Sequence, residues 1–99
     1  MAGAKLVIQN GGFDGMEYLL EAEETLIGRN PTTDVTLLDE NISREHALIL
    51  FDPESGIYTI EDLQSTNGTK VNGKGIRSHP LEPGDEIQIG HTRFQFVRG

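Results

Sequence analysis

The chain has no cysteine and few basic residues. Without cysteine, disulfide bonds, iron–sulfur clusters and cysteine-based zinc sites are excluded. The 99 residues include 16 acidic and 8 basic side chains, which leaves a net charge of −8 at pH 7. A nucleic-acid binder needs basic surface to release counterions from the phosphate backbone, and a polybasic membrane anchor needs positive charge as well. The charge therefore predicts that the chain binds neither nucleic acid nor membranes.

Long apolar runs are also missing. The longest are about six residues, whereas a helix needs about 20 to span a bilayer. The N-terminal sequence MAGAKLVIQ has no apolar stretch long enough for a signal peptide. A length of 99 residues suits one small domain. We therefore expect a soluble, cytoplasmic and monomeric domain over residues 1–99, with its core at about 6–97, which can be one module of a longer protein.

The apolar residues that are present alternate with a period of two. Runs typical of strands occupy residues 6–9, 16–22, 25–27, 57–60, 86–89 and 92–97. The run Ala47–Phe51 is apolar throughout and predicts a buried strand. Twelve glycines and four prolines punctuate the chain. Their spacing, about eight to twelve residues, favours an all-β sandwich or barrel.

Two short segments predict tight turns. Asn72-Gly73 is the residue pair that two-residue hairpins prefer, and we interpret it as a turn. Gly90-His91 separates two alternating runs and has the right length for a second hairpin.

Three further segments are not explained by strand formation alone, and the first is Ile27-Gly28-Arg29. Here a strand ends and an arginine follows a glycine. Arginine offers five donors in a planar fork that suits a phosphate or a carboxylate. Taken alone, the segment is better interpreted as an exposed surface arginine before a turn.

The second segment is Ile42-Ser43-Arg44-Glu45-His46. Ser43 can donate a hydroxyl proton and Arg44 a charged hydrogen bond. His46 precedes an apolar strand, which favours a structural role in which a neutral ring bridges loop groups. A catalytic Ser–His pair is the alternative, but the sequence offers neither an orienting carboxylate nor a G-x-S-x-G elbow.

The third segment is Ser65-Thr66-Asn67-Gly68, which follows Asp62-Leu63-Gln64. Its Asn-Gly step alone would predict a simple turn. Two hydroxyls and a carboxamide before the glycine nevertheless offer a polar binding surface on a loop, where functional residues concentrate.

Together and in this order, the three segments resemble the forkhead-associated (FHA) family of phosphothreonine-binding domains. The matching residues are Ile27-Gly28-Arg29, Ile42-Ser43-x-x-His46 and Asp62-Leu63-x-Ser65-Thr66-Asn67-Gly68-Thr69-x-Val71-Asn72-Gly73. Leu81-x-x-Gly84-Asp85-x-Ile87-x-Ile89-Gly90 is similar to the family's penultimate strand. The resemblance implies an all-β sandwich of two antiparallel sheets, with about eleven strands and with binding loops at one end.

The resemblance also implies the site residues. Arg29, Ser43, Arg44 and Thr66 match positions that bind the phosphate, and Asn67 matches the position that binds the ligand backbone beside the phosphothreonine. In the same way, Gly28, His46 and Gly68 match positions that support the loops. We also expect Asp39 and Glu40 to lie beside the pocket and to disfavour acidic residues in the bound peptide.

The implied function is phosphothreonine-dependent binding of protein partners marked by a Ser/Thr kinase in signalling. The alternative is a docking or scaffold domain on the same fold that ignores phosphorylation. An enzyme is not predicted, because the three histidines lack metal-ligand spacing and no phosphate-cradling G-x-x-x-x-G-K-[ST] loop is present. No cofactor and no metal site are predicted.

The charges are unevenly distributed along the chain. Five acidic residues and no Lys or Arg lie between Asp14 and Glu24, whereas three basic residues and no acidic ones lie between Leu63 and Leu81. We therefore expect a locally positive binding end on an acidic body.

Overall fold

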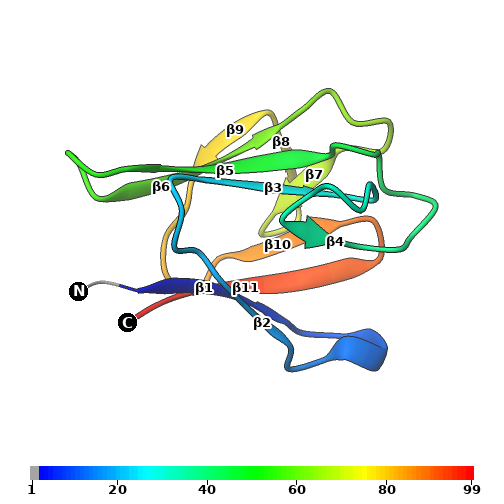
Figure 1. The fold of residues 1–99 in the computed structure, drawn as a ribbon, viewed down its shortest axis with the longest axis horizontal. Helices are drawn as coiled ribbons and strands as arrows, with labels where there is room; N and C mark the ends of the chain where they lie inside the picture. Colours follow the sequence, from blue (N-terminus) through cyan, green and yellow to red (C-terminus); the bar gives the residue numbers. More distant parts are fainter. Residues whose placement is uncertain (1–2) are drawn as a thin grey trace.

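The computed structural model describes residues 3–99, which form eleven strands and one short 3₁₀ helix. The strands build two sheets that face each other, as the resemblance implies (Figure 1). The six-stranded sheet has the order β2 (Glu17–Leu19), β1 (Ala4–Ile8), β11 (Thr92–Arg98), β10 (Glu86–Ile89), β7 (Thr69–Val71), β8 (Lys74–Ile76). The five-stranded sheet has the order β4 (Val35–Thr36), β3 (Glu24–Gly28), β5 (Ala47–Asp52), β6 (Ile57–Asp62), β9 (Ser78–Pro80). The 3₁₀ helix η1 spans Gly11–Phe13 between β1 and β2.

The core lies between the sheets and follows from the alternation of apolar residues. In β1 and β10 every second residue is buried, so that one face of each strand packs inward. Leu6, Ile27, Ile60, Phe94 and Phe96 are almost fully buried and come from both sheets. Each such side chain contributes about 1.5–3 kcal/mol by leaving water, which makes this layer the main source of stability.

The run Ala47–Phe51 forms a strand as predicted, but only one of its faces is buried. Ala47 and Ile49 of β5 are buried, whereas Leu48 and Leu50 are half-buried, because only one face of the strand meets the core. An antiparallel sandwich covers one face of each sheet, and a solid apolar run does not change that geometry.

One strand pair departs from the antiparallel expectation. β3 and β4 pair in parallel, with Ile27 opposite Val35 and Gly28 opposite Thr36. The connecting loop doubles back on itself through the Thr33 hydroxyl, which lies 2.7 Å from the Asn30 carbonyl. A connection this short suffices because the pairing is only two residues long.

Both predicted hairpins are confirmed. Val71 pairs with Lys74 across Asn72-Gly73, whose φ angles of 53° and 84° are those that a tight hairpin turn requires. Ile89 pairs with Thr92 across Gly90-His91. Four of the five shortest strands, β4, β7, β8 and β9, were not predicted individually, since two or three residues are too few to show an alternation.

The registers of the sheets bring several loops to one end. Ile27 at the end of β3 pairs with Ala47 at the start of β5, which pairs with Asp62 at the end of β6. In the other sheet, Ile89 of β10 pairs with Thr69 and Thr92. Loops 29–34, 37–46, 63–68 and 90–91 therefore share one end, and the chain termini lie at the other (Figure 1). We call it the loop end. Within residues 3–99, no helix is long and apolar enough to cross a membrane.

Candidate functional site

Three loops at the loop end are joined directly to one another by hydrogen bonds. The Arg29 N–H donates to the Ser43 carbonyl at 3.1 Å, and the Asn30 N–H donates to the Arg44 carbonyl at 3.1 Å. The Thr66 N–H donates to the Ser43 hydroxyl oxygen at 3.0 Å. Ser43 therefore stands between the loop after β3 and the loop after β6.

Gly28 makes the close contact between the first two loops possible. A Cβ atom added at Gly28 would lie 2.1 Å from the carbonyl oxygen of Arg44 and 3.1 Å from the Cα of Glu45. Both neighbours are backbone atoms that cannot turn aside. Only glycine allows the end of β3 to lie against this segment, and this contact sets where Arg29 emerges.

Arg29 is exposed, but its side chain is oriented by the neighbouring loop. Its Nε donates to the Ile42 carbonyl at 3.0 Å. Within residues 3–99 its two terminal nitrogens have no hydrogen-bond or ion-pair partner. A guanidinium held by Nε presents its other donors in a fixed direction, which suits an anion such as phosphate.

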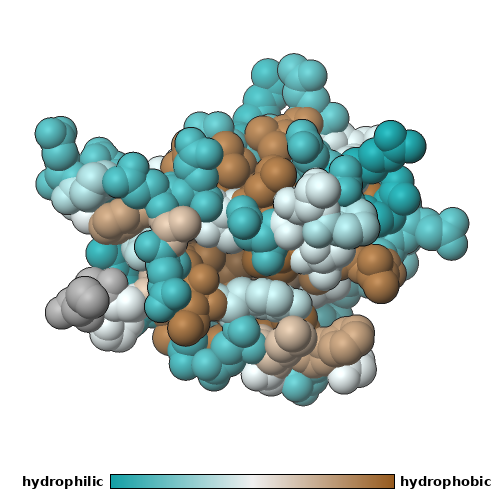
Figure 2. Space-filling model, viewed as in Figure 1, coloured by the Kyte–Doolittle hydropathy of each residue, from teal (hydrophilic) through white to brown (hydrophobic). Residues whose placement is uncertain are grey.

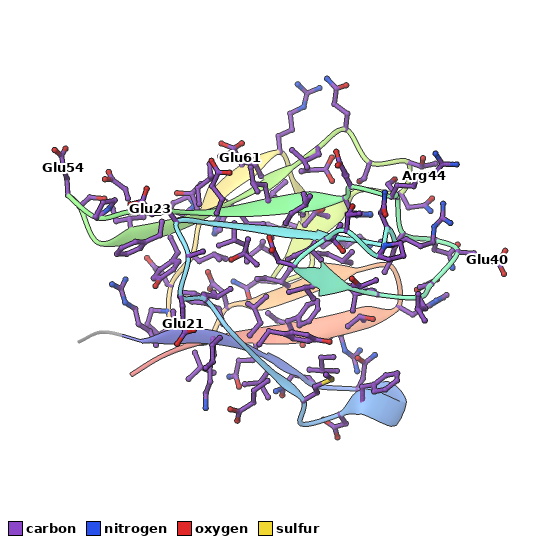
Figure 3. The ribbon with its side chains drawn as sticks, in the orientation of Figure 1. Glu21, Glu23, Glu40, Arg44, Glu54 and Glu61 are labelled. Carbon is purple, nitrogen blue, oxygen red and sulfur yellow. The ribbon has the colours of Figure 1, made fainter. Side chains whose placement is uncertain are left out.

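Two hydroxyls and a second arginine complete the set of donors at the loop end. The Ser43 oxygen accepts from Thr66 N–H, so its own proton remains available for a ligand. The Thr66 side chain is exposed. Arg44 is exposed and projects from the loop end, and Glu40 lies on the same side (Figure 3). No hydrogen bond or ion pair within the described residues engages the side chains of Arg44 or Thr66.

His46 bridges the second and third loops from within. It is 0% exposed. Its Nδ1 accepts from the Ser43 N–H at 3.0 Å, and its Nε2 lies 2.8 Å from the Gly68 carbonyl. Since Nδ1 accepts, Nε2 must carry the proton that the carbonyl receives, so the ring is the neutral Nε2–H form.

The hydrogen bonds of His46 do not favour the alternative of a catalytic Ser43–His46 pair. Both nitrogens of His46 are occupied by backbone groups, and neither bonds to the Ser43 hydroxyl. A nucleophilic serine requires a base within hydrogen-bonding reach of its hydroxyl, and His46 does not act in that way here. No group of three or more potential ligands within residues 3–99 is placed to hold a metal ion.

Asp62 organises the third loop, and sequence reasoning assigned it no role. Its carboxylate accepts from the Ser65 N–H at 3.1 Å, from the Ser65 hydroxyl and from the Thr69 hydroxyl at 2.8 Å. Burial raises the pKa of Asp62, but the hydrogen bonds from Ser65 and Thr69 together outweigh it and hold the pKa below its ordinary value of 3.8. The spacing Asp-x-x-Ser, typical of a carboxylate that caps a turn, was the available signal.

Asn67 lies at the outer edge of this loop. Its Nδ2 donates to the Asn41 carbonyl at 2.9 Å, which leaves the amide oxygen and the second amide proton for a ligand. Gly68, with φ of +83°, turns the chain immediately afterwards, and a side chain would be strained there. The support of Asn67 by Asn41 was not predicted, because the acceptor is a backbone carbonyl, which every residue carries.

Asp39 is a loop anchor whose partly exposed carboxylate is held by backbone donors. One carboxylate oxygen accepts from the Asn41 N–H at 2.9 Å, and the other from the His91 N–H at 2.9 Å. These backbone hydrogen bonds hold the pKa of Asp39 below 3.8. A lowered pKa keeps Asp39 ionised, so the repulsion of acidic ligands by Asp39 and Glu40 stays a prediction.

A hollow of about 280 Å³ adjoins Asn67 at the loop end. It is lined by Asn41, Asn67, Gly68, Lys70, Gln88, Gly90 and His91. The structure brings the eight residues selected from the sequence to this end. Seven lie in its hydrogen-bonded loops, and Gly28 is the last residue of β3: Gly28, Arg29, Ser43, Arg44, His46, Thr66, Asn67 and Gly68. The arrangement offers cationic and neutral donors to an anionic group, with a hollow beside them for the rest of a ligand.

Comparison with known proteins agrees with this geometry. The family model of the FHA domain matches residues 25–90. An oxoglutarate dehydrogenase inhibitor of Corynebacterium diphtheriae is 40% identical over 99 residues, which cover 99% of this chain and 68% of the relative. Glycogen accumulation regulator GarA of Mycolicibacterium smegmatis is 41% identical over 96 residues, which cover 97% of this chain and 60% of the relative.

Solved structures are similar over nearly the whole chain. EmbR of Mycobacterium tuberculosis in complex with a low-affinity phosphopeptide has a TM-score of 0.88 and 37% identity, covering 98% of this chain and 24% of that chain. A structure from a study of phosphothreonine-dependent FHA domain interactions has a TM-score of 0.86 and 32% identity, covering 96% of this chain and 95% of that chain.

The chain spans 60% to 68% of the length of the first four curated relatives that it matches. The family model covers more than half of the chain, and it includes the ends of the strands from which all three loops emerge. Sequence, fold and loop geometry agree, and the chain belongs to the FHA domain family.

Proposed function

We propose that this domain binds phosphothreonine in partner proteins that a Ser/Thr kinase has modified, and that it recruits those partners in signalling. One observation carries the proposal. Ser43 is hydrogen-bonded to both neighbouring loops, and around it the terminal nitrogens of Arg29 and the hydroxyls of Ser43 and Thr66 remain free to donate.

The chemistry of these donors suits a phosphate monoester. A phosphothreonine carries about −1.5 to −2 charges and three acceptor oxygens at neutral pH. Charge-assisted hydrogen bonds from Arg29 and Arg44 contribute roughly 1.5–3 kcal/mol each, and neutral ones from Ser43 and Thr66 about 0.5–1.5 kcal/mol. Desolvation and ordering of the peptide oppose them, so an affinity in the micromolar range, about −8 kcal/mol, is expected.

The remaining site residues do not contact the phosphate; they bind the ligand backbone or hold the loops in place. Asn67 binds the ligand backbone beside the phosphothreonine through its unused amide groups. Gly28, His46 and Gly68 hold the loops, because each fixes a contact between two loops or a turn within one. The phosphopeptide named for EmbR and the phosphothreonine-dependent interactions named for the second structure support phosphopeptide binding as the function.

A binding module is favoured over an enzyme. His46 is hydrogen-bonded on both ring nitrogens, and the relatives are named as an inhibitor and as a regulator. The free donors at Arg29, Ser43 and Thr66 also favour phosphate-dependent binding over phosphate-independent docking. Docking alone does not require cationic and hydroxyl donors to be gathered around Ser43.

A titration with matched peptides tests the proposal. Calorimetry would compare peptides that differ only in Thr or phosphothreonine, with Arg29→Ala as the site variant and exposed Arg77→Ala as the control. We expect the wild type and Arg77→Ala to bind only the phosphopeptide, and Arg29→Ala to bind it 10- to 100-fold more weakly, since one charged hydrogen bond is lost. Equal binding of both peptides would disprove the phosphate dependence, and turnover of the phosphopeptide would show an enzyme.

We further propose that the domain is a monomer in the cytoplasm and binds no nucleic acid. A net charge of −8 opposes self-association and nonspecific polyanion binding. Sedimentation equilibrium and fractionation of cells that produce the tagged protein test these points.

A further inference from the structure

A groove runs along one flank of the sandwich, between the edge strands β2 and β4. Each of these strands has a neighbour on one side only, so both border solvent. Two hollows lie between them, one of about 410 Å³ and one of about 430 Å³, and both contain Tyr18 in their walls. We call this pair of hollows the flank groove. Figure 2 shows brown surface in the depression between the two layers.

The half of the flank groove nearer the loop end is apolar. Phe13, Met16, Tyr18, Leu37 and Leu38 contribute to its walls. Leu38 is 89% exposed and Phe13 is 71% exposed, which is unusual for side chains of this kind when they lie together. Burial of these side chains by another molecule would be favourable, because apolar surface would leave water.

The other half is acidic. Glu17, Glu21, Glu24 and Asp34 contribute to its walls. Glu17 pairs with Lys5 at 3.1 Å and Asp34 accepts from a backbone N–H, but neither Glu21 nor Glu24 forms an ion pair within residues 3–99. The flank groove therefore presents apolar surface followed by negative charge that the described chain does not neutralise.

The flank groove is continuous with the loop end. His91 lines both the apolar half and the hollow beside Asn67. Asp39, which also lines the apolar half, binds the His91 N–H and the loop that carries Asn41. A ligand that occupies the hollow beside Asn67 can thus extend past His91 into the flank groove. About ten extended residues would cover the 35 Å length of the molecule.

We propose that the flank groove binds a second segment of the phosphorylated partner, in which an aliphatic or aromatic residue is followed, away from the phosphothreonine, by Lys or Arg. The inference rests on the proposed function, since the phosphothreonine is the anchor. A basic segment complements the acidic half. A second copy of this chain does not, because two molecules of charge −8 repel each other.

Selection from two peptide libraries tests the proposal. Both libraries contain one phosphothreonine, with ten random residues before it in one and after it in the other. We expect enrichment of an apolar residue and of Lys or Arg, at fixed distances from the phosphothreonine, in one of the two libraries. Affinities would then be measured for the selected long peptide and for a short peptide that ends two residues from the phosphothreonine.

Variants distinguish the two halves of the flank groove. We expect Leu38→Asp to lower the affinity for the long peptide at least tenfold and the affinity for the short peptide less than twofold. The double variant Glu21→Lys, Glu24→Lys should have the same effect. Matched controls lie at the β5–β6 turn, away from the groove: Ile57→Asp, an exposed apolar residue, and Glu54→Lys (Figure 3). We expect both controls to bind the long peptide as the wild type does.

Three results would overturn the inference. The first is that neither library shows enrichment although the short phosphopeptide binds. The second is that the groove variants and the control variants lose the same affinity for the long peptide. The third is that the wild type sediments as a dimer and Leu38→Asp as a monomer. Failure of the proposed function is recognised separately, because the wild type would then bind no short peptide in a phosphate-dependent way.

Discussion

At the scale of single residues, the site depends on groups that do not face the ligand. Gly28 contributes only the absence of a side chain, which lets the Arg44 carbonyl lie against β3. His46 contributes an acceptor and a donor on opposite sides of one ring, matched to the Ser43 N–H and the Gly68 carbonyl. These residues determine the positions from which Arg29 and Ser43 donate.

Gly28→Ala should lower the free energy of unfolding by about 2 kcal/mol or more, because its Cβ would meet backbone atoms that cannot move away. Gly75→Ala is the matched control, since a Cβ at Gly75 meets nothing within 4 Å and its φ is not in the left-handed region. Urea denaturation measures both. Equal free energies of unfolding for the two variants would show that β3 can move away from the Arg44–Glu45 segment without loss of stability.

His46→Ala should cost about 2–4 kcal/mol, since it leaves a cavity and leaves a backbone donor and a backbone acceptor without partners. Phosphopeptide binding should also fall, because the loops of Ser43 and Gly68 lose their bridge. His79→Ala, at a half-exposed position, is the control. Unchanged unfolding of His46→Ala in urea would contradict the bridging role.

At the scale of elements, strand registers place the loops and two carboxylates hold them in shape. Asp62 at the end of β6 closes the loop of residues 63–68 through Ser65 and Thr69. Asp39 ties the loop of residues 37–46 to the β10–β11 hairpin through the His91 N–H. An ionised carboxylate accepts these hydrogen bonds more strongly than a protonated carboxyl group, in which one oxygen becomes a donor, so the loops should lose stability in acid.

The lowered pKa of Asp62 sets the direction of that sensitivity. A carboxyl whose pKa is lower in the folded state adds stability above its ordinary value of 3.8 and loses it as the pH falls through the folded-state value. Asp62→Asn should therefore be less stable than the wild type at pH 7, by about 1–3 kcal/mol. The difference should shrink as the pH falls below about 4. Denaturation from pH 7 to pH 3 measures it, and a difference independent of pH would refute the role of the charge.

At the scale of the whole molecule, the expected excess of positive charge at the binding end is not found. The four loops of the loop end carry two basic residues, Arg29 and Arg44, and four acidic ones, Asp34, Asp39, Glu40 and Glu45. Figure 3 shows Glu21, Glu23 and Glu54 away from the loop end and Arg44 at it, although Glu40 lies near Arg44. Lys70 borders the hollow beside Asn67. Screening over roughly 8–10 Å lets nearby cations dominate at contact distance while the net charge of −8 acts farther away. An acidic protein can therefore bind a single phosphate.

A few directed donors on an acidic protein predict different responses to two kinds of anion. Duplex DNA should show no measurable binding at about 150 mM salt, since the acidic body repels it. Phosphopeptide affinity should fall only a few-fold between about 50 and 500 mM salt, because directed hydrogen bonds are screened less than distant charges. Fluorescence anisotropy measures both, and DNA binding comparable to that of the phosphopeptide would refute the prediction.

The amino-acid sequence by itself determined what depends on neighbours along the chain. The period of two predicted the long strands, the Asn-Gly pair predicted the β7–β8 hairpin, and the three loop motifs predicted the family. Side-chain alternation and turn preferences are local, so they can be recognised without a fold.

Only the tertiary structure decided what depends on partners far apart in the chain. Asp39 meets His91 52 positions later, His46 meets Gly68 22 positions later, and β2 borders β4 across the flank groove. The parallel pairing of β3 with β4 and the half-exposed face of β5 also depend on how distant segments pack. Which distant groups meet is set by the registers of two packed sheets, and those registers follow from the burial of the whole core rather than from any one segment.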